Sequence, residues 1–153
     1  MDYLPILDAC GNTKVGGAMR DAIARLFDRD RKLLELDAKE EAIAHALAVY
    51  MAPHFEGLHV DVEYNRMGPH PKRVTWNQKP EYVYPDIIVH VRDTETNVLA
   101  IELKKGSNPE PKDDDVRKLG AYRGELGYVH ALFLRLGVGK QSGTVLECEW
   151  VHL

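Results

Sequence analysis

Two short segments of the chain carry acidic and basic side chains at spacings that suit chemistry on a phosphate. The first is PDIIVH at residues 85–90, which contains Asp86, and the second is IELKK at residues 101–105, which contains Glu102 and Lys104. Both segments are rich in β-branched and aliphatic residues, a composition typical of strands. Because side chains two residues apart in a strand point to the same face, Glu102 and Lys104 are expected to share one.

Segment 93–97 separates these two strands and has the composition of a hairpin loop. If the chain turns about Thr94, Asp86 lies directly opposite Glu102, since each is eight residues from the turn. The Cβ atoms of such a pair are about 5 Å apart, so the two carboxylates could share a hard cation such as Mg²⁺ or Mn²⁺. Lys104 would stand beside it and orient a water or stabilise a phosphate. This arrangement predicts metal-assisted hydrolysis of a phosphodiester.

The same three residue types also occur on ordinary protein surfaces, where Asp, Glu and Lys of a hairpin form a solvated ion pair. Two features favour the catalytic interpretation. The charged residues are embedded in apolar strands rather than placed at their tips, and a helix acid is also available in front of them.

Helices are expected before this hairpin. Apolar periodicity predicts one over residues 18–36, interrupted near 28–30, and a second from Asp37 to Pro53. Asp37 and Glu40 have capping-box spacing at the start of the second helix. Residues 1–17 contain Pro5 and three glycines, and we expect an irregular lead-in there.

The rest of the chain alternates between strands and one more helix. Residues 58–66 alternate apolar and polar side chains, whereas residues 68–80 hold three prolines and are expected to form a long loop. A helix over 113–126 would begin with three aspartates and end at Gly127. Two strands follow, around 128–136 and 144–151. This order predicts a single α/β (α+β) domain over residues 1–153, one sheet with helices packed on it.

Composition narrows the range of partners. Hydrophobic residues make up 44% and charged residues 29% of the 153, which excludes a disordered chain. The net charge of −4 argues against a surface that is basic all over, so nucleic acid would have to be bound by a local patch. Cys10 and Cys148 are isolated thiols, although a disulfide between them stays open. No signal peptide or membrane span is evident, and we expect a cytoplasmic protein.

A basic stretch supplies the candidate patch. Residues 64–80 contain four Lys or Arg side chains and no acid, with Trp76 and His70 between them as stacking groups. Further cations on the later helix and its approach would extend this patch, and the alternative is a solvated basic loop. The cations considered are Arg66, Lys72, Arg73 and Lys79 in the stretch, and Lys105, Lys112, Arg117 and Lys118 beyond it.

The motifs together resemble a known family. Pro85-Asp86 followed by Glu102-Leu103-Lys104 is similar to the motif of the PD-(D/E)XK, or restriction-endonuclease-like, nuclease superfamily. The element order over residues 37–137 resembles its αβββαβ core. With the segment VDVEYNR at residues 60–66, the two motifs more narrowly resemble a group of small bacterial proteins of that superfamily. The resemblance implies a central mixed sheet flanked by helices, and a Mg²⁺-dependent nuclease that acts on DNA rather than RNA.

The resemblance also implies roles for individual residues. Asp86 and Glu102 would bind the metal, with the Leu103 carbonyl as a further ligand, and Lys104 would position the attacking water. Members of the superfamily often add an acid from the first core helix. Glu40 and Glu41 both qualify here; we favour Glu40, at the edge of the stripe that faces the sheet, unless it only completes the capping box.

Lys118 and Tyr122 are four residues apart and share a helix face. They resemble the QxxxY element of exonuclease-like branches, with Lys in place of Gln, and would then contact nucleic acid. The alternative is a core tyrosine beside a surface lysine.

Two other functions stay open. The chain could be a catalytically silent module that binds nucleic acid. It could also be a subunit of a mobile-element or defence system that depends on a partner protein. A homodimer would suit cutting of both strands of a duplex.

Overall fold

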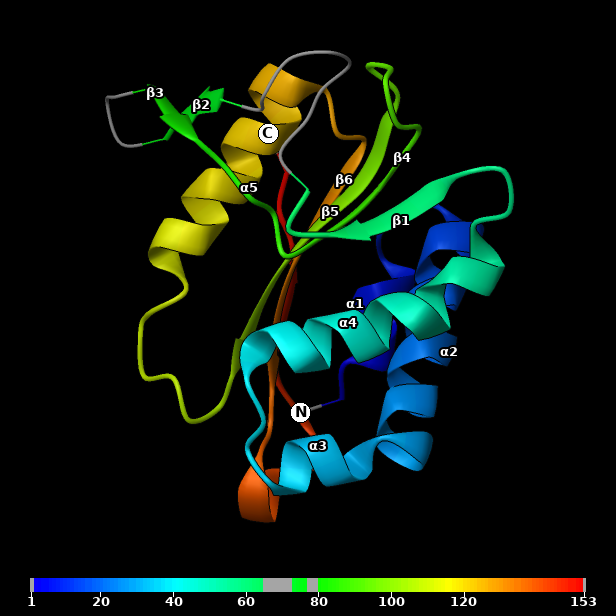
Figure 1. Cartoon of the computed structure of the whole chain (residues 1–153), viewed down its shortest axis with the longest axis vertical. Coiled ribbons are helices and arrows are strands. Elements are labelled where there is room, and N and C mark those ends of the chain that lie inside the picture. Colours follow the sequence, from blue (N-terminus) through cyan, green and yellow to red (C-terminus); the bar gives the residue numbers. More distant parts are fainter. Residues whose placement is uncertain (1, 65–72, 77–79, 153) are drawn as a thin grey trace.

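The computed structural model describes residues 2–64, 73–76 and 80–152, and these fold into a central sheet with helices on both faces (Figure 1). The N-terminal part is helical up to residue 54. In chain order its elements are α1 (Leu4–Asp8), α2 (Thr13–Arg29), α3 (Arg31–Glu35), α4 (Glu40–Met51) and the 3₁₀ turn η1 (Ala52–His54). Later in the chain lie α5 (Asp113–Leu126) and the 3₁₀ turn η2 (Gly139–Gln141).

Five strands form the central sheet in the order β1-β4-β5-β6-β7. They are β1 (His59–Val62), β4 (Ile87–His90), β5 (Asn97–Lys105), β6 (His130–Leu136) and β7 (Val145–Trp150). β5 and β6 are parallel and the other neighbours are antiparallel. α5 makes the crossover that a parallel pair requires. The expected mixed sheet flanked by helices is therefore confirmed.

The predicted hairpin register is also confirmed. β4 and β5 pair Ile87 with Ile101, Ile88 with Ala100 and Val89 with Leu99, as a turn about Thr94 requires. A bulge shifts the register next to His90. β4 begins at Ile87, so Asp86 lies just before it.

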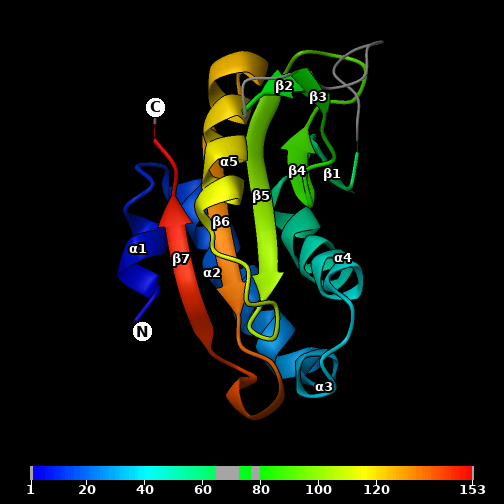
Figure 2. The ribbon, with the colours of Figure 1, turned by 90° about the vertical axis from the view of Figure 1, so that its left-hand side faces the viewer.

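Strand alternation divides the core between the two faces. In β5, Leu99, Ile101 and Leu103 pack into a cluster with α2 and α4, whereas Ala100 packs into a smaller cluster with α5. Glu102 and Lys104 follow Ala100 at intervals of two and lie on the α5 face. Figure 2 shows α5 in front of the sheet and α2 behind it.

The expectation of an irregular N-terminal segment is wrong. α1 buries Leu7, and Trp150 Nε1 of β7 donates to the Ile6 carbonyl at 2.8 Å. α2 begins at Thr13, where the Asn12 side chain caps it by accepting from Val15 N at 3.1 Å. Gly16 lies within this helix, and a larger residue would not fit there because its Cβ would lie 2.9 Å from the Leu7 carbonyl oxygen. The glycine allows close helix packing rather than breaking the helix.

Two other details differ from expectation. Asp37 does not form a capping box: Lys39 is the N-cap of α4, without a side-chain bond, and Asp37 has a φ of 52°. The stretch 68–80 is not all loop, because β2 (Arg73–Thr75) and β3 (Pro80–Tyr82) form a separate antiparallel pair. The expected interruption near residues 28–30 is confirmed, with Asp30 between α2 and α3. Among the described residues, no helix is long and apolar enough to cross a membrane.

Candidate active site

The candidate site lies where β5 continues past the start of β4 (Figure 2). Beyond Ile87, no strand in the described part of the chain pairs with this edge of β5, and carboxylates accept hydrogen bonds from its backbone amides. Leu103 N donates to Asp86 Oδ2 at 2.7 Å, and Lys105 N donates to Glu40 Oε1 at 3.3 Å. An extended residue directs its N–H and C=O to the same side. The Leu103 carbonyl therefore also points toward the Asp86 side of β5.

Asp86 and Glu102 are brought together as the register predicted. Their carboxyl groups lie close enough that each shifts the pKa of the other. Glu102 is only 8% exposed, and its Oε1 accepts a hydrogen bond from Tyr122 Oη of α5 at 2.8 Å. Asp86 is more exposed than Glu102 and Tyr122.

Burial controls the protonation of this pair. Loss of water raises the pKa of Asp86, and nearby Glu40 and Asp115 add to this, while hydrogen bonds from Glu102 and Leu103 N oppose it. Burial and the charge of Asp86 raise the pKa of Glu102 well above its usual value. The pair therefore holds a proton at a pH where ordinary carboxylates have lost theirs. A divalent cation could replace that proton, because both satisfy the same excess of negative charge.

Lys104 lies on the same face as Glu102, as predicted, and is also 8% exposed. Its Nζ is 3.1 Å from Asp115 Oδ2 of α5 and 3.1 Å from Glu110 Oε2. Burial alone would disfavour the ammonium, but these two carboxylates outweigh it and hold the pKa of Lys104 above its usual value. Lys104 is therefore held in its protonated, charged form. Since Glu102 and Lys104 are both buried, the alternative of a solvated surface ion pair is wrong.

Glu40 and Glu41 are both present at the rim of a pocket of about 210 Å³, which Asp86 also lines. Asn108 Nδ2 donates to Glu40 Oε1 at 3.1 Å, so Glu40 is fixed toward β5 from two sides. The remaining lining includes Glu63 and Lys39. Glu40 is therefore the better placed of the two acids, and its alternative role in a capping box is wrong.

The donor chemistry of this edge fits a hard divalent cation. Asp86, Glu102, Glu40 and the Leu103 carbonyl all offer oxygen, the ligand that Mg²⁺ prefers. In the described part of the chain, no three His, Cys, Asp or Glu side chains are already gathered as a metal site. Metal binding at this edge stays a prediction.

The predicted nucleic-acid contacts fall into different places. Lys118 and Arg117 line a pocket of about 470 Å³ on the α5 face, together with Lys104 and Asp115. Arg73 is exposed on β2. Arg66, Lys72, Lys79 and His70 lie outside the described residues.

One of the predicted contacts is wrong. Tyr122 is 1% exposed and binds Glu102, so it cannot touch nucleic acid from this position. Two of the predicted cations are paired within the protein. The Lys105 ammonium is held by Asp37 Oδ1 at 3.0 Å and by the Ala38 carbonyl at 3.1 Å, which ties the start of α4 to β5. Lys112 pairs with Glu149 of β7 at 3.0 Å. Their contact with nucleic acid stays a prediction.

Sequence reasoning missed three residues that position Lys104. Asp115 was read only as a helix-dipole acid, although it continues the buried stripe of Leu119, Tyr122 and Leu126 at helical spacing. Arg135 of β6 donates to the carbonyls of Asn108 and Glu110, both at 2.7 Å, and so holds the loop that carries Glu110. The helical spacing could have revealed Asp115. No local signal pointed to Glu110 or Arg135.

Comparisons of this chain with family models, with curated proteins and with solved structures find no match. A function for this chain is therefore inferred from the geometry of the site and from the chemistry of its residues.

Proposed function

We propose that this protein is a Mg²⁺-dependent nuclease that hydrolyses phosphodiester bonds, in DNA rather than RNA, and that Mn²⁺ can replace Mg²⁺. One observation carries the proposal: two neighbouring carboxyl groups with raised pKa values, Asp86 and Glu102, lie at a strand edge beside the buried cation Lys104. Keeping such groups away from water is costly, and strongly perturbed carboxyl groups concentrate at functional sites. The element order α4, β1, β4, β5, α5, β6 also supports a restriction-endonuclease-like core.

In this proposal Asp86, Glu102 and the Leu103 carbonyl hold the metal, with Glu40 as the further acid from α4. When bound, Mg²⁺ supplies a Lewis acid for a phosphate oxygen and makes water more acidic. Tyr122 orients Glu102 through its hydrogen bond, and Asp86 is oriented by the Leu103 amide.

Lys104 acts as an electrostatic group rather than as a base. Its raised pKa keeps it protonated, so its Nζ donates hydrogen bonds and accepts no proton. It would orient the attacking water and stabilise negative charge that develops on the phosphate oxygens. Asp115 limits the positions that the ammonium can take, since it binds the ammonium from α5.

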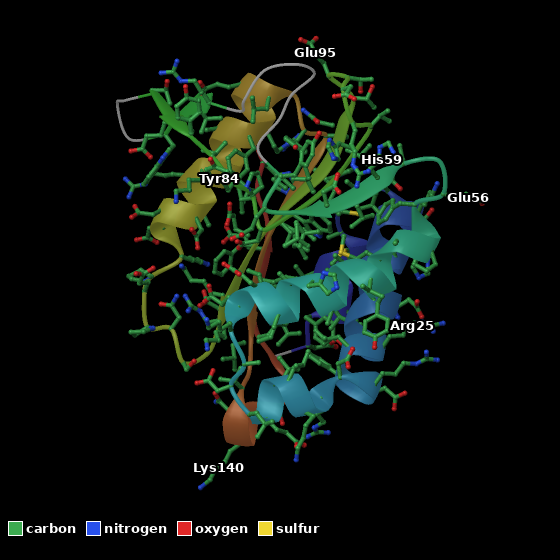
Figure 3. All side chains as sticks on the ribbon, in the orientation of Figure 1. Arg25, Glu56, His59, Tyr84, Glu95 and Lys140 are labelled. Carbon is green, nitrogen blue, oxygen red and sulfur yellow. The ribbon has the colours of Figure 1, made fainter. Side chains whose placement is uncertain are left out.

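Cleavage assays test the proposal directly. Labelled single- and double-stranded DNA and RNA are incubated with Mg²⁺, Mn²⁺ or EDTA, using the wild type, Asp86→Asn and Glu95→Gln. Glu95 is a matched control, because it is an exposed acid at the opposite end of the same hairpin (Figure 3). We expect metal-dependent cutting of DNA that Asp86→Asn abolishes and Glu95→Gln retains. Equal cutting by Asp86→Asn would contradict the assignment of the site.

A partner-dependent subunit is the second candidate. One observation favours it: the Lys104 ammonium is already bound by Asp115 and by the exposed Glu110, so a partner that displaces Glu110 could free it. Calorimetry separates the candidates when the isolated protein cuts nothing. Uptake of Mg²⁺ or Mn²⁺ that Asp86→Asn abolishes would favour the partner-dependent subunit, and no uptake would favour a silent binding module.

A further inference from the structure

The pair β2–β3 presents two aromatic rings to solvent beside the candidate site. Tyr82 is 59% exposed and Tyr84 is 60% exposed, whereas Val83 between them is buried against the α5 side of the core. The alternation anchors the segment through Val83 and turns both rings outward. Figure 3 labels Tyr84 on the segment that joins β3 to β4. Tyr84 is only two residues from Asp86.

Cations accompany the aromatic rings of this segment. The Arg73 guanidinium lies 5.1 Å from the centre of the Tyr82 ring, and Lys118 Nζ lies 4.8 Å from the centre of the Trp76 ring. Both distances are within the range of cation–π contacts. Lys118 also lines the pocket that contains Lys104. Lys118 therefore connects Trp76 of this hairpin with the pocket that contains Lys104.

Among the described residues of this surface, two acids accompany the two cations. Glu81 accepts a hydrogen bond from Trp76 Nε1 at 2.7 Å, and Glu125 accepts one from Thr75 N at 3.0 Å. These acids hold the hairpin together and against α5. The flat faces of the exposed rings therefore offer a means of recognition in addition to charge.

We propose that Tyr82 and Tyr84 stack on the bases of an unpaired nucleic-acid strand and deliver that strand to Asp86 and Glu102, an inference that rests on the proposed function. Stacking requires a base whose flat face is accessible. In a duplex neighbouring bases cover those faces, so the surface selects single-stranded over double-stranded substrate. Arg73 and Lys118 contact the phosphates on either side.

Binding measurements in EDTA test this inference without any cleavage. The anisotropy of a labelled 12-nucleotide single strand, as DNA and as RNA, is compared with that of the duplex of the same sequence. The variants are Tyr84→Ala and Tyr82→Ala, each with its Phe counterpart, and Val49→Ala is the control. Val49 is 53% exposed on α4, so it matches the solvent exposure of the tyrosines. Exposed positions of this kind tolerate substitution with little loss of stability.

We expect the wild type to bind the single strand more tightly than the duplex. Each Tyr→Ala change should weaken single-strand binding about five- to 150-fold, the loss of one stacked base, while Phe retains it. Val49→Ala should bind like the wild type. Equal binding of duplex and single strand, unchanged binding by both Ala variants, or no binding at all would overturn the inference. Metal-dependent cleavage of duplex by the same preparations would then leave the nuclease itself standing.

Discussion

The two faces of the central sheet differ in what they bury. The face against α2 and α4 is mainly apolar, with Ile87, Ile101 and Leu134 fully buried among aliphatic side chains. The face against α5 is apolar only in part. Towards the end of β5 it buries Glu102 and Lys104, and Arg135 of β6 is a third buried charged residue on this face.

This difference separates stability from chemistry within one sheet. Apolar burial contributes about 25 cal/mol per Å², whereas buried charged groups are costly unless they are paired. On the α5 face Lys104 is paired with Asp115 and Glu110, whereas Asp86 and Glu102 are two neighbouring acids whose pKa values are raised. We infer that the α4 face stabilises the fold, whereas the α5 face loses part of that stability by burying the charged residues of the candidate site.

The largest expected effect is on stability, from the apolar face. Ile101→Ala should lower the free energy of unfolding by about 2–5 kcal/mol, because it leaves a cavity between the sheet and α4. Urea denaturation measures the loss, and cleavage per folded molecule should stay near the wild-type rate. A comparable loss of cleavage in the folded variant would show that the two faces are not separable.

An effect of similar size, but on cleavage, is expected from the charged face. Lys104→Gln should slow cleavage about 10²–10³-fold, since the amide lacks the charge that stabilises the phosphate. Its NH₂ group can still donate to Asp115, but the buried Asp115 carboxylate loses its paired charge, so the midpoint of urea denaturation should also fall. Cleavage is therefore compared per folded molecule. Lys140→Gln is the control, because Lys140 is an exposed lysine of η2 (Figure 3). Undiminished cleavage by Lys104→Gln would remove Lys104 from the mechanism.

The smallest expected effect is a pH dependence of stability. The pKa values of Asp86 and Glu102 are raised in the folded state, so this state keeps protons that the unfolded chain loses above about pH 4. The free energy of unfolding of the metal-free protein should therefore fall as the pH rises from about 4 to the raised pKa values of the folded state. Thermal unfolding of Glu102→Gln should show a flatter dependence, because the amide does not titrate.

Adding Mg²⁺ sharpens this measurement. The cation should stabilise the wild type most at high pH, where the proton is lost, and should stabilise Glu102→Gln much less. Carboxyl groups with lowered pKa values, such as Asp21 and Asp37, act in the opposite direction at acidic pH. Their contribution is the same in both proteins and cancels in the difference. If the stability of the two proteins had the same pH dependence, the pKa of Glu102 would not be raised in the folded state.

Much of the charged face was predictable from local pattern. The alternation of β5 correctly placed Glu102 and Lys104 on one face, and the hairpin correctly placed Asp86 opposite Glu102. The end of α5 at Gly127 was equally readable, because its φ of 72° favours glycine. These features depend on periodicity or on single residues, both of which are visible without knowledge of distant contacts.

Contacts between distant segments were not predictable in this way. α1 was missed because its five residues are held by β7, through a hydrogen bond between Trp150 and Ile6. Asp37 was assigned to a cap because its spacing from Glu40 fits one, whereas Lys105 and Ser107 bind its carboxylate instead. Tyr122 was assigned to nucleic acid because a helix face alone does not reveal whether it is covered.

The sequence by itself thus determined which residues share a strand face, where the hairpin turns and which oxygen donors lie side by side. Only the tertiary structure decided that β4 begins at Ile87 and leaves the edge of β5 to Asp86 and Glu40. It also decided that α5 covers Glu102 with Tyr122 and pairs Lys104 with Asp115. The physical reason is that desolvation and electrostatic interaction depend on every group packed around a charge, and those groups come from segments far apart in the chain.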